Sequence, residues 1–98
     1  MNIIRRVIVH GRVQGVGYRA FVEAEAIRRG IAGYVRNRRD GTVEAVFEGE
    51  VAAVAEMVAV CRRGPRGAQI DTIDEREGNA ADLASRDQGV AFTVLPTV

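Results

Sequence analysis

The alternation of strand-like and helix-like segments constrains the fold of this chain more than any other feature of its sequence. Runs rich in β-branched residues predict strands, and longer segments with apolar residues at helical spacing predict helices. The pattern predicts, in chain order, a strand, a helix, two strands, a helix and two strands, over residues 3–9, 18–29, 31–37, 42–48, 51–62, 68–74 and 90–94. The polar segment 75–89 is low in β-propensity and is predicted to be an exposed loop or a short helical turn.

This order is β-α-β-β-α-β with a short extra C-terminal strand, which is the ferredoxin-like α+β sandwich. It predicts a single domain over residues 1–98, with two helices on one face of a mainly antiparallel sheet. The first two strands are predicted to run parallel, joined by a right-handed helical crossover, with the third strand between them in the opposite sense. The glycine-rich end of the first strand and Asn37, at the end of the second, should therefore meet at one edge of the sheet.

Apolar side chains predict which surfaces of these elements form the core. In the alternating strand 42–48, Val43, Ala45 and Phe47 share the face that is expected to meet the helices. The expected core faces of the two helices contain Ala20, Phe21, Ala24 and Ile27 on the first, and Val51, Val54, Ala55, Val58 and Cys61 on the second. Cys61 is therefore interpreted as a small core residue.

The inventory of reactive side chains excludes several kinds of site. The chain has one Cys and one His, which cannot build a zinc site from Cys and His ligands. All fourteen basic residues are Arg, which excludes a Schiff-base enzyme and the Walker-type phosphate loop, since both need Lys. The single His, His10, closes the first strand and is interpreted as a structural or surface residue.

Charge, hydropathy and cysteine usage predict a cytoplasmic protein that binds neither nucleic acid nor membrane, and we expect it to be a monomer. The formal net charge of +1 gives no overall electrostatic attraction to nucleic acid or anionic lipid. No apolar run approaches the roughly 20 residues of a membrane span, and the N-terminus lacks the pattern of a signal peptide. A single Cys can form no internal disulfide, which fits a reducing cytosol.

The segment GRVQGVG, residues 11–17, predicts a phosphate-binding loop. It has three glycines in seven residues and leads into a helix N-terminus, so that backbone N–H groups can point inward around an anion. Arg19, in the first helical turn, supplies a planar guanidinium matched to phosphate oxygens. From these residues alone two alternatives stay open: the loop is a plain connection, and Arg19 pairs with Glu23 one helical turn away.

Two segments of the chain resemble the signature sequences of the acylphosphatases. Residues 13–19 (VQGVGYR), preceded by Gly11, are similar to the first signature. Residues 33–37 (GYVRN) and 40–44 (DGTVE) together are similar to the second. The resemblance spans residues 3–74, and it implies the ferredoxin-like fold that the order of elements also predicts.

The resemblance further implies an enzyme that hydrolyses the carboxyl–phosphate bond of small acyl phosphates to a carboxylate and inorganic phosphate, without a metal or cofactor. Arg19 and the backbone N–H groups of the loop would hold the phosphoryl group, the residues concerned being Gln14, Gly15, Val16, Gly17, Tyr18 and Arg19. Asn37 would orient the attacking water through its side-chain amide. Arg38 follows Asn37 at a position where some family members carry a Thr that is thought to help order water. This difference concerns the water molecules around Asn37.

Two alternatives from other functional classes stay open. A nucleic-acid-binding module of the same topology is suggested by Arg36, Arg38 and Arg39 beside Asn37, although this cluster is also typical of a solvated hairpin tip or could attract an anionic substrate. Such modules stack bases on aromatic residues of the central strands, where this chain offers only Phe47. The other alternative is a regulatory module that keeps the fold with little catalytic activity.

Overall fold

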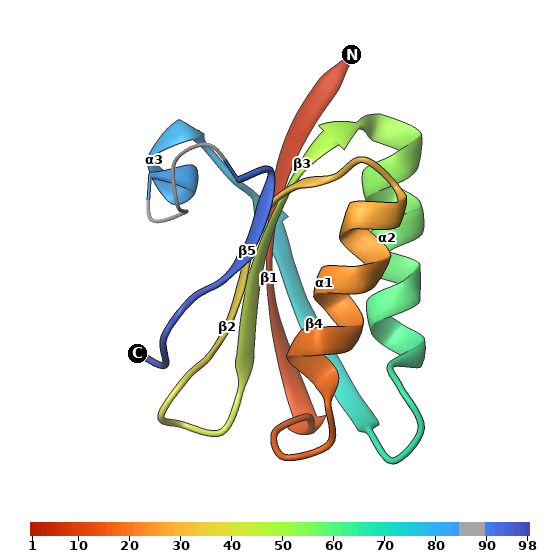
Figure 1. Cartoon of the computed structure of the whole chain (residues 1–98), viewed down its shortest axis with the longest axis vertical. Coiled ribbons are helices and arrows are strands. Elements are labelled where there is room, and N and C mark those ends of the chain that lie inside the picture. The colour runs from red at the N-terminus through yellow and green to blue at the C-terminus, as the bar shows by residue number, and fades with distance from the viewer. Residues whose placement is uncertain (85–89) are drawn as a thin grey trace.

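The computed structural model describes residues 1–84 and 90–98, which build one five-stranded sheet with helices on its faces (Figure 1). Its elements are β1 (Asn2–Arg12), α1 (Tyr18–Arg28), β2 (Ala32–Asn37), β3 (Val43–Glu50), α2 (Val51–Arg63), β4 (Gln69–Glu77), α3 (Ala80–Leu83) and β5 (Phe92–Val94). The strand order is β4-β1-β3-β2-β5. β3 is antiparallel to both β1 and β2, and β5 is parallel to β2. The ferredoxin-like fold, with β1 and β2 parallel around β3, is therefore confirmed.

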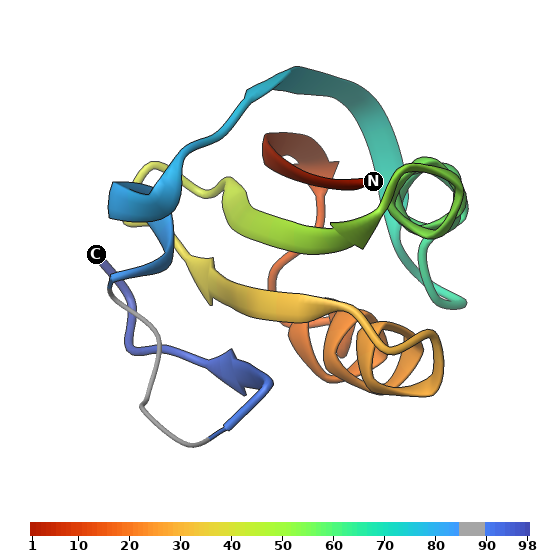
Figure 2. The ribbon, with the colours of Figure 1, turned by 90° about the horizontal axis from the view of Figure 1, so that it is seen from above.

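The two long helices, α1 and α2, cover one face of the sheet, as Figures 1 and 2 show. The main core lies between the helices and this face, where Val43, Ala45 and Phe47 are each at most 1% exposed. The prediction that these three side chains meet the helices is confirmed. A smaller apolar cluster of Tyr34, Val46 and Leu95 lies apart from the main core, with Ile4 and Leu83 packed against it.

The buried face of α1 differs from the predicted one. Its buried residues are Tyr18, Val22 and Ala26. The predicted core residues that are exposed instead are Ala20, Ala24 and Ile27. Of the predicted set, only Phe21 packs against the core. Tyr18 orients the helix because its ring is buried and its hydroxyl donates a hydrogen bond to the carbonyl oxygen of Cys61 in α2 across 2.8 Å. Side chains four and eight positions after Tyr18 then share its face.

The predicted core face of α2 is confirmed at Val54, Val58 and Cys61, which are buried. The prediction is wrong at Val51 and Ala55, which are exposed. Val51 is the first residue of the helix, and Ala55 lies outside the i, i+3, i+4, i+7 stripe that begins at Val54. The stripe also contains a residue that the prediction omitted, Met57, which is fully buried.

The prediction that a loop begins at residue 75 is wrong, because β4 continues to Glu77. β4 is an edge strand paired with β1 out to Arg5↔Glu77, and its polar side chains are tolerated since most of them face solvent. The predicted helical turn corresponds to α3, which Asn79 and Asp82 close with a capping box. Of the predicted last strand 90–94 only Phe92–Val94 is extended, and residues 85–89 of the predicted loop lie outside the described residues.

No helix within residues 1–84 and 90–98 is both long and apolar enough to cross a membrane.

Candidate active site

The glycine loop, residues 13–17 between β1 and α1, adopts a backbone geometry that favours glycine. Gly15 has a φ of 74° and Gly17 a φ of 79°, both in the left-handed region. Gly17 is also the N-cap residue of α1, and its carbonyl oxygen accepts a hydrogen bond from the backbone N–H of Phe21 at 3.0 Å. No side chain in the described part of the chain caps this helix. Its first backbone N–H groups are therefore available to an anion.

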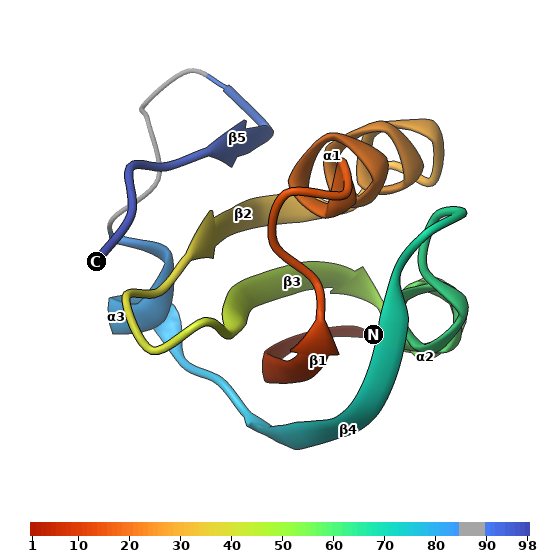
Figure 3. The same ribbon diagram turned by 90° about the horizontal axis from the view of Figure 1, so that it is seen from below.

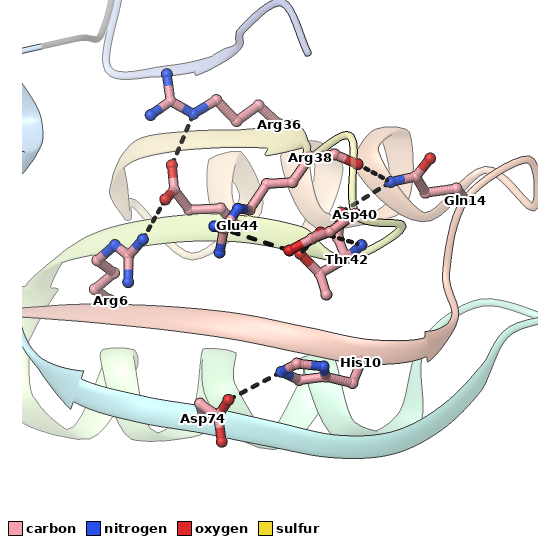
Figure 4. Close-up of polar contacts among 9 residues, drawn as sticks. All are labelled: Arg6, His10, Gln14, Arg36, Arg38, Asp40, Thr42, Glu44 and Asp74. Atoms are coloured by element: carbon pink, nitrogen blue, oxygen red, sulfur yellow. Dashed lines mark hydrogen bonds and ion pairs between the residues drawn. The ribbon is translucent and has the colours of Figure 1, made fainter. Parts of the chain in front are cut away.

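The glycine loop is joined to the β2–β3 hairpin (residues 38–42) by the side chain of Gln14. Its amide Nε2 donates hydrogen bonds to the carbonyl oxygens of Arg38, at 2.8 Å, and Thr42, at 2.9 Å (Figure 4). The hairpin is closed in turn by Asp40, whose Oδ1 accepts from the backbone N–H and the hydroxyl of Thr42 at 3.0 and 2.6 Å. Loop and hairpin lie at the same end of the sheet in Figures 1 and 3. The glycine loop and the hairpin are therefore linked to each other at the end of the sheet where Asn37 lies.

A pocket of about 300 Å³ opens at this end of the molecule. It is lined by Val13, Gly15, Gly17, Tyr18, Arg19, Ala20, Glu23, Asn37 and Val94. Arg19 and Asn37, 18 positions apart in the sequence, thus share one pocket, as the parallel arrangement of β1 and β2 predicts. Of the residues whose backbone was predicted to hold a phosphoryl group, Gln14 and Val16 are absent from the pocket lining.

Asn37, the last residue of β2, presents an unusual acceptor. Its side-chain Oδ1 is buried and has no hydrogen-bond partner among the described residues. A buried polar atom without a partner costs about 1–3 kcal/mol, so such atoms are rare in folded proteins. The backbone of Asn37 is held firmly, since its carbonyl oxygen accepts from the N–H of Val98 at 3.1 Å. Asn37 therefore lines the pocket with a backbone that is held in place, and its buried carboxamide oxygen has no partner among the described residues.

Arg19 lines the pocket from the first turn of α1. Within the described residues its guanidinium takes part in no ion pair and no side-chain hydrogen bond, so the alternative in which Glu23 neutralises it is not seen. An unpaired guanidinium beside a helix N-terminus and a glycine loop can bind an anion through two parallel N–H donors.

The remaining reactive side chains lie elsewhere. His10 pairs with Asp74 across 2.9 Å between β1 and β4, which fits its predicted structural or surface role. Cys61 is fully buried, and this burial raises the pKa of its thiol to about 12. Burial also raises the pKa of Tyr18. Among the described residues no three His, Cys, Asp or Glu side chains gather closely enough to hold a metal ion.

A buried carboxylate, Glu44, organises the strands beside the site. It is 4% exposed and accepts hydrogen bonds from Arg6 Nη2 at 2.5 Å and Arg36 Nε at 2.7 Å (Figure 4). Burial alone would raise the pKa of Glu44, but the hydrogen bonds from Arg36 and Arg6 hold it below its ordinary value. Of the three arginines predicted as a cluster, Arg36 is thus engaged by Glu44, and Arg38 lies 3.8 Å from Asp40.

The structure adds features that sequence reasoning missed. The clamp made by the Gln14 side chain depends on the approach of loop and hairpin, which only the assembled fold defines. Val94 reaches the pocket from β5, whose place beside β2 no sequence pattern indicated. The sequence indicates Glu23 only as a partner of Arg19, four positions away, whereas the structure places it in the pocket lining as well.

Comparison with known proteins identifies the family. The acylphosphatase family model matches residues 5–86. A curated acylphosphatase of Rhodopseudomonas palustris (strain BisB18) is 54% identical over 97 residues, 99% of this chain and 98% of its own length. The crystal structure of acylphosphatase from Bacillus subtilis is 37% identical with a TM-score of 0.82, covering 97% of this chain and 99% of that one. An acylphosphatase structure from Coxiella burnetii is 28% identical with a TM-score of 0.83, covering 96% and 93%. The chain therefore belongs to the acylphosphatase family of enzymes.

Proposed function

We propose that this enzyme hydrolyses small acyl phosphates to a carboxylate and inorganic phosphate by direct attack of water, without a metal ion. The observation that carries the proposal is the shared pocket, which is lined by the unpaired Arg19, by the left-handed Gly15 and Gly17 and by Asn37. Action as a cytoplasmic monomer that binds no nucleic acid stays a prediction.

The phosphoryl group would be held by Arg19 and by backbone N–H groups of residues 14–19. Support comes from the left-handed conformations of Gly15 and Gly17 and from the absence of a side-chain cap on α1 within the described residues. Gln14 contributes in a second way, because its side chain fixes the loop to the hairpin. Preorganised donors of this kind contribute on the order of 3 kcal/mol each where negative charge develops in a transition state.

The attacking water would be oriented by Asn37. Its side-chain amide can hydrogen-bond a water, donating from Nδ2 or accepting at Oδ1. A carboxamide cannot act as a base at neutral pH, so its role is positioning. Positioning of this kind lowers the activation free energy, because the entropy cost of orienting the water is met when the water binds.

The chemistry needs little else from the protein. The water oxygen forms a bond to phosphorus, the bond from phosphorus to the acyl oxygen breaks, and the carboxylate leaves with the electron pair. Because a carboxylic acid has a pKa of roughly 4, this group departs without a general acid. The proton of the water passes to a phosphoryl oxygen. The charge on the phosphoryl oxygens is balanced by the guanidinium and the N–H dipoles, which is the work that a metal does in other phosphoryl-transfer enzymes.

The proposal is tested by assaying benzoyl phosphate hydrolysis in the presence of EDTA, with wild type, Arg19→Gln and Arg66→Gln. Arg66 is an exposed arginine outside the pocket lining and serves as the control for loss of one positive charge. We expect wild type and Arg66→Gln to be active and Arg19→Gln to lose roughly 100-fold or more in kcat/KM. Loss of wild-type activity on chelation would contradict metal independence, and RNA binding without any hydrolysis would favour the nucleic-acid module.

A further inference from the structure

Glu23 is the one carboxylate among the described residues that line the pocket, and the proposed mechanism gives it no role. It lies on α1 one helical turn beyond Arg19, at the i, i+4 spacing that places side chains about 5–6 Å apart at their Cβ atoms. Its side chain is partly buried, and in residues 1–84 and 90–98 it takes part in no ion pair and no side-chain hydrogen bond. The lining therefore holds one guanidinium, from Arg19, and one carboxylate, from Glu23, and the described residues show no ion pair between them.

The pocket has two chemically different ends. Gly15 and Gly17 form the end suited to a phosphoryl group, together with the start of α1. Apart from Val13 and Asn37, the other walls are Ala20 and Glu23 from α1 and Val94 from β5, which packs beside that helix. In the proposed function, a phosphoryl group seated on the glycine loop would leave the acyl part of the substrate beside these walls. Glu23 would then face the acyl group.

We infer, building on the proposed function, that Glu23 determines specificity by selecting acyl phosphates whose acyl group is uncharged. A second carboxylate in the acyl chain would lie near the Glu23 carboxylate and be repelled by it. At a separation of roughly 6 Å in a solvent-accessible pocket this repulsion lowers kcat/KM by roughly three- to tenfold. In the proposed function Arg19 is engaged by the phosphoryl group of the substrate, and neither Arg38 nor Arg39 lines the pocket, so these cations do not offset the repulsion.

The experiment compares butyryl phosphate with succinyl phosphate, since their acyl chains have similar lengths and only the second carries a further carboxylate. The quantity measured is the ratio of kcat/KM for butyryl phosphate to kcat/KM for succinyl phosphate. Because both substrates carry the same phosphoryl group, the effect of Glu23 on that group cancels in the ratio. The variants are Glu23→Gln, Glu23→Asp and, as the control, Glu77→Gln, which removes an exposed charge at the opposite end of the sheet.

We expect wild type to prefer butyryl phosphate, Glu23→Gln to lower the preference roughly three- to tenfold, and the Asp variant and the control to keep it. Raising the salt concentration to about 1 M should lower the preference of wild type more than that of Glu23→Gln, because salt screens exposed charges. An unchanged ratio in Glu23→Gln, or an equal fall for both substrates, would overturn the inference while leaving the proposed function intact. Wild type that hydrolyses neither substrate would refute the proposed function itself.

Discussion

The side-chain amide of Gln14 donates a hydrogen bond to the carbonyl oxygen of Arg38 across 2.8 Å, and thereby fixes the glycine loop to the residue that follows Asn37. A second bond from the same nitrogen reaches the carbonyl of Thr42. The two halves of the site come from segments joined by a helix and a strand, and neither half alone dictates their separation. This amide therefore links the loop proposed to bind phosphate to the strand end that is proposed to hold water.

Replacing Gln14 with Ala should reduce catalysis without removing any group that touches the substrate. The loop and the hairpin lose their link, and small misplacement of reacting groups costs up to roughly 100-fold in rate. We expect kcat/KM for benzoyl phosphate to fall about tenfold and the free energy of unfolding to fall by about 1–2 kcal/mol. Gln69→Ala, at an exposed position of β4, is the control and should match wild type. Full activity in Gln14→Ala would show that the clamp is dispensable.

Replacing Asn37 with Ala tests whether this residue positions water or holds the phosphoryl group. We expect kcat to fall by roughly 100-fold, while the inhibition constant of inorganic phosphate stays within about twofold of wild type, since the change removes an interaction made in the transition state. Steady-state kinetics with phosphate as a competing product measures both values. Asn2→Ala, on an exposed residue, is the control. A parallel loss of phosphate affinity would assign Asn37 to phosphate binding.

The sequence pattern predicts this fold well because each element carries its own signal. The alternation of Val43, Ala45 and Phe47 and the order of strands and helices leave few topologies. The parallel orientation of β1 and β2, on either side of β3, places Arg19 and Asn37 at one end of the sheet. The glycine loop and the end of β2 are each recognisable from local sequence, and the right-handed crossover rule brings them together. The shared pocket could therefore be predicted before any coordinates.

The features that the sequence did not predict depend on contacts between distant segments. The buried face of α1 is oriented by the hydrogen bond from Tyr18 to Cys61. These two residues are 43 positions apart in the sequence, and their bond joins α1 to α2. The length of β4 is set by its backbone hydrogen bonds to β1. A polar residue such as Glu77 can form these bonds as well as an apolar one can. The charge of Glu44 is compensated by Arg6 and Arg36 only in the assembled sheet.

Removing the charge of Glu44 should destabilise the protein. Glu44→Gln leaves the guanidinium groups of Arg6 and Arg36, which are only partly exposed, without their anionic partner. Breaking a buried ion pair in this way costs about 3–5 kcal/mol, and the partial exposure of the arginines reduces the expected loss to about 2–4 kcal/mol. Urea denaturation measures the change, with the exposed Glu77→Gln as the control. A loss below about 0.5 kcal/mol would show that the three charges contribute little to stability.

The same carboxylate predicts how stability depends on pH. Hydrogen bonds from Arg36 and Arg6 outweigh burial and hold the pKa of Glu44 below its ordinary value, so at acidic pH the unfolded chain binds this proton more readily than the folded chain. The stabilisation is therefore fully present above the ordinary glutamate pKa of about 4.3 and is lost as pH falls through the lower pKa of the folded state. We expect the difference in unfolding free energy between wild type and Glu44→Gln to be constant from about pH 7 to 5 and to shrink below about pH 4. Urea denaturation of both proteins across this range measures it, and a difference that grew on acidification would mean that the folded-state pKa of Glu44 is raised.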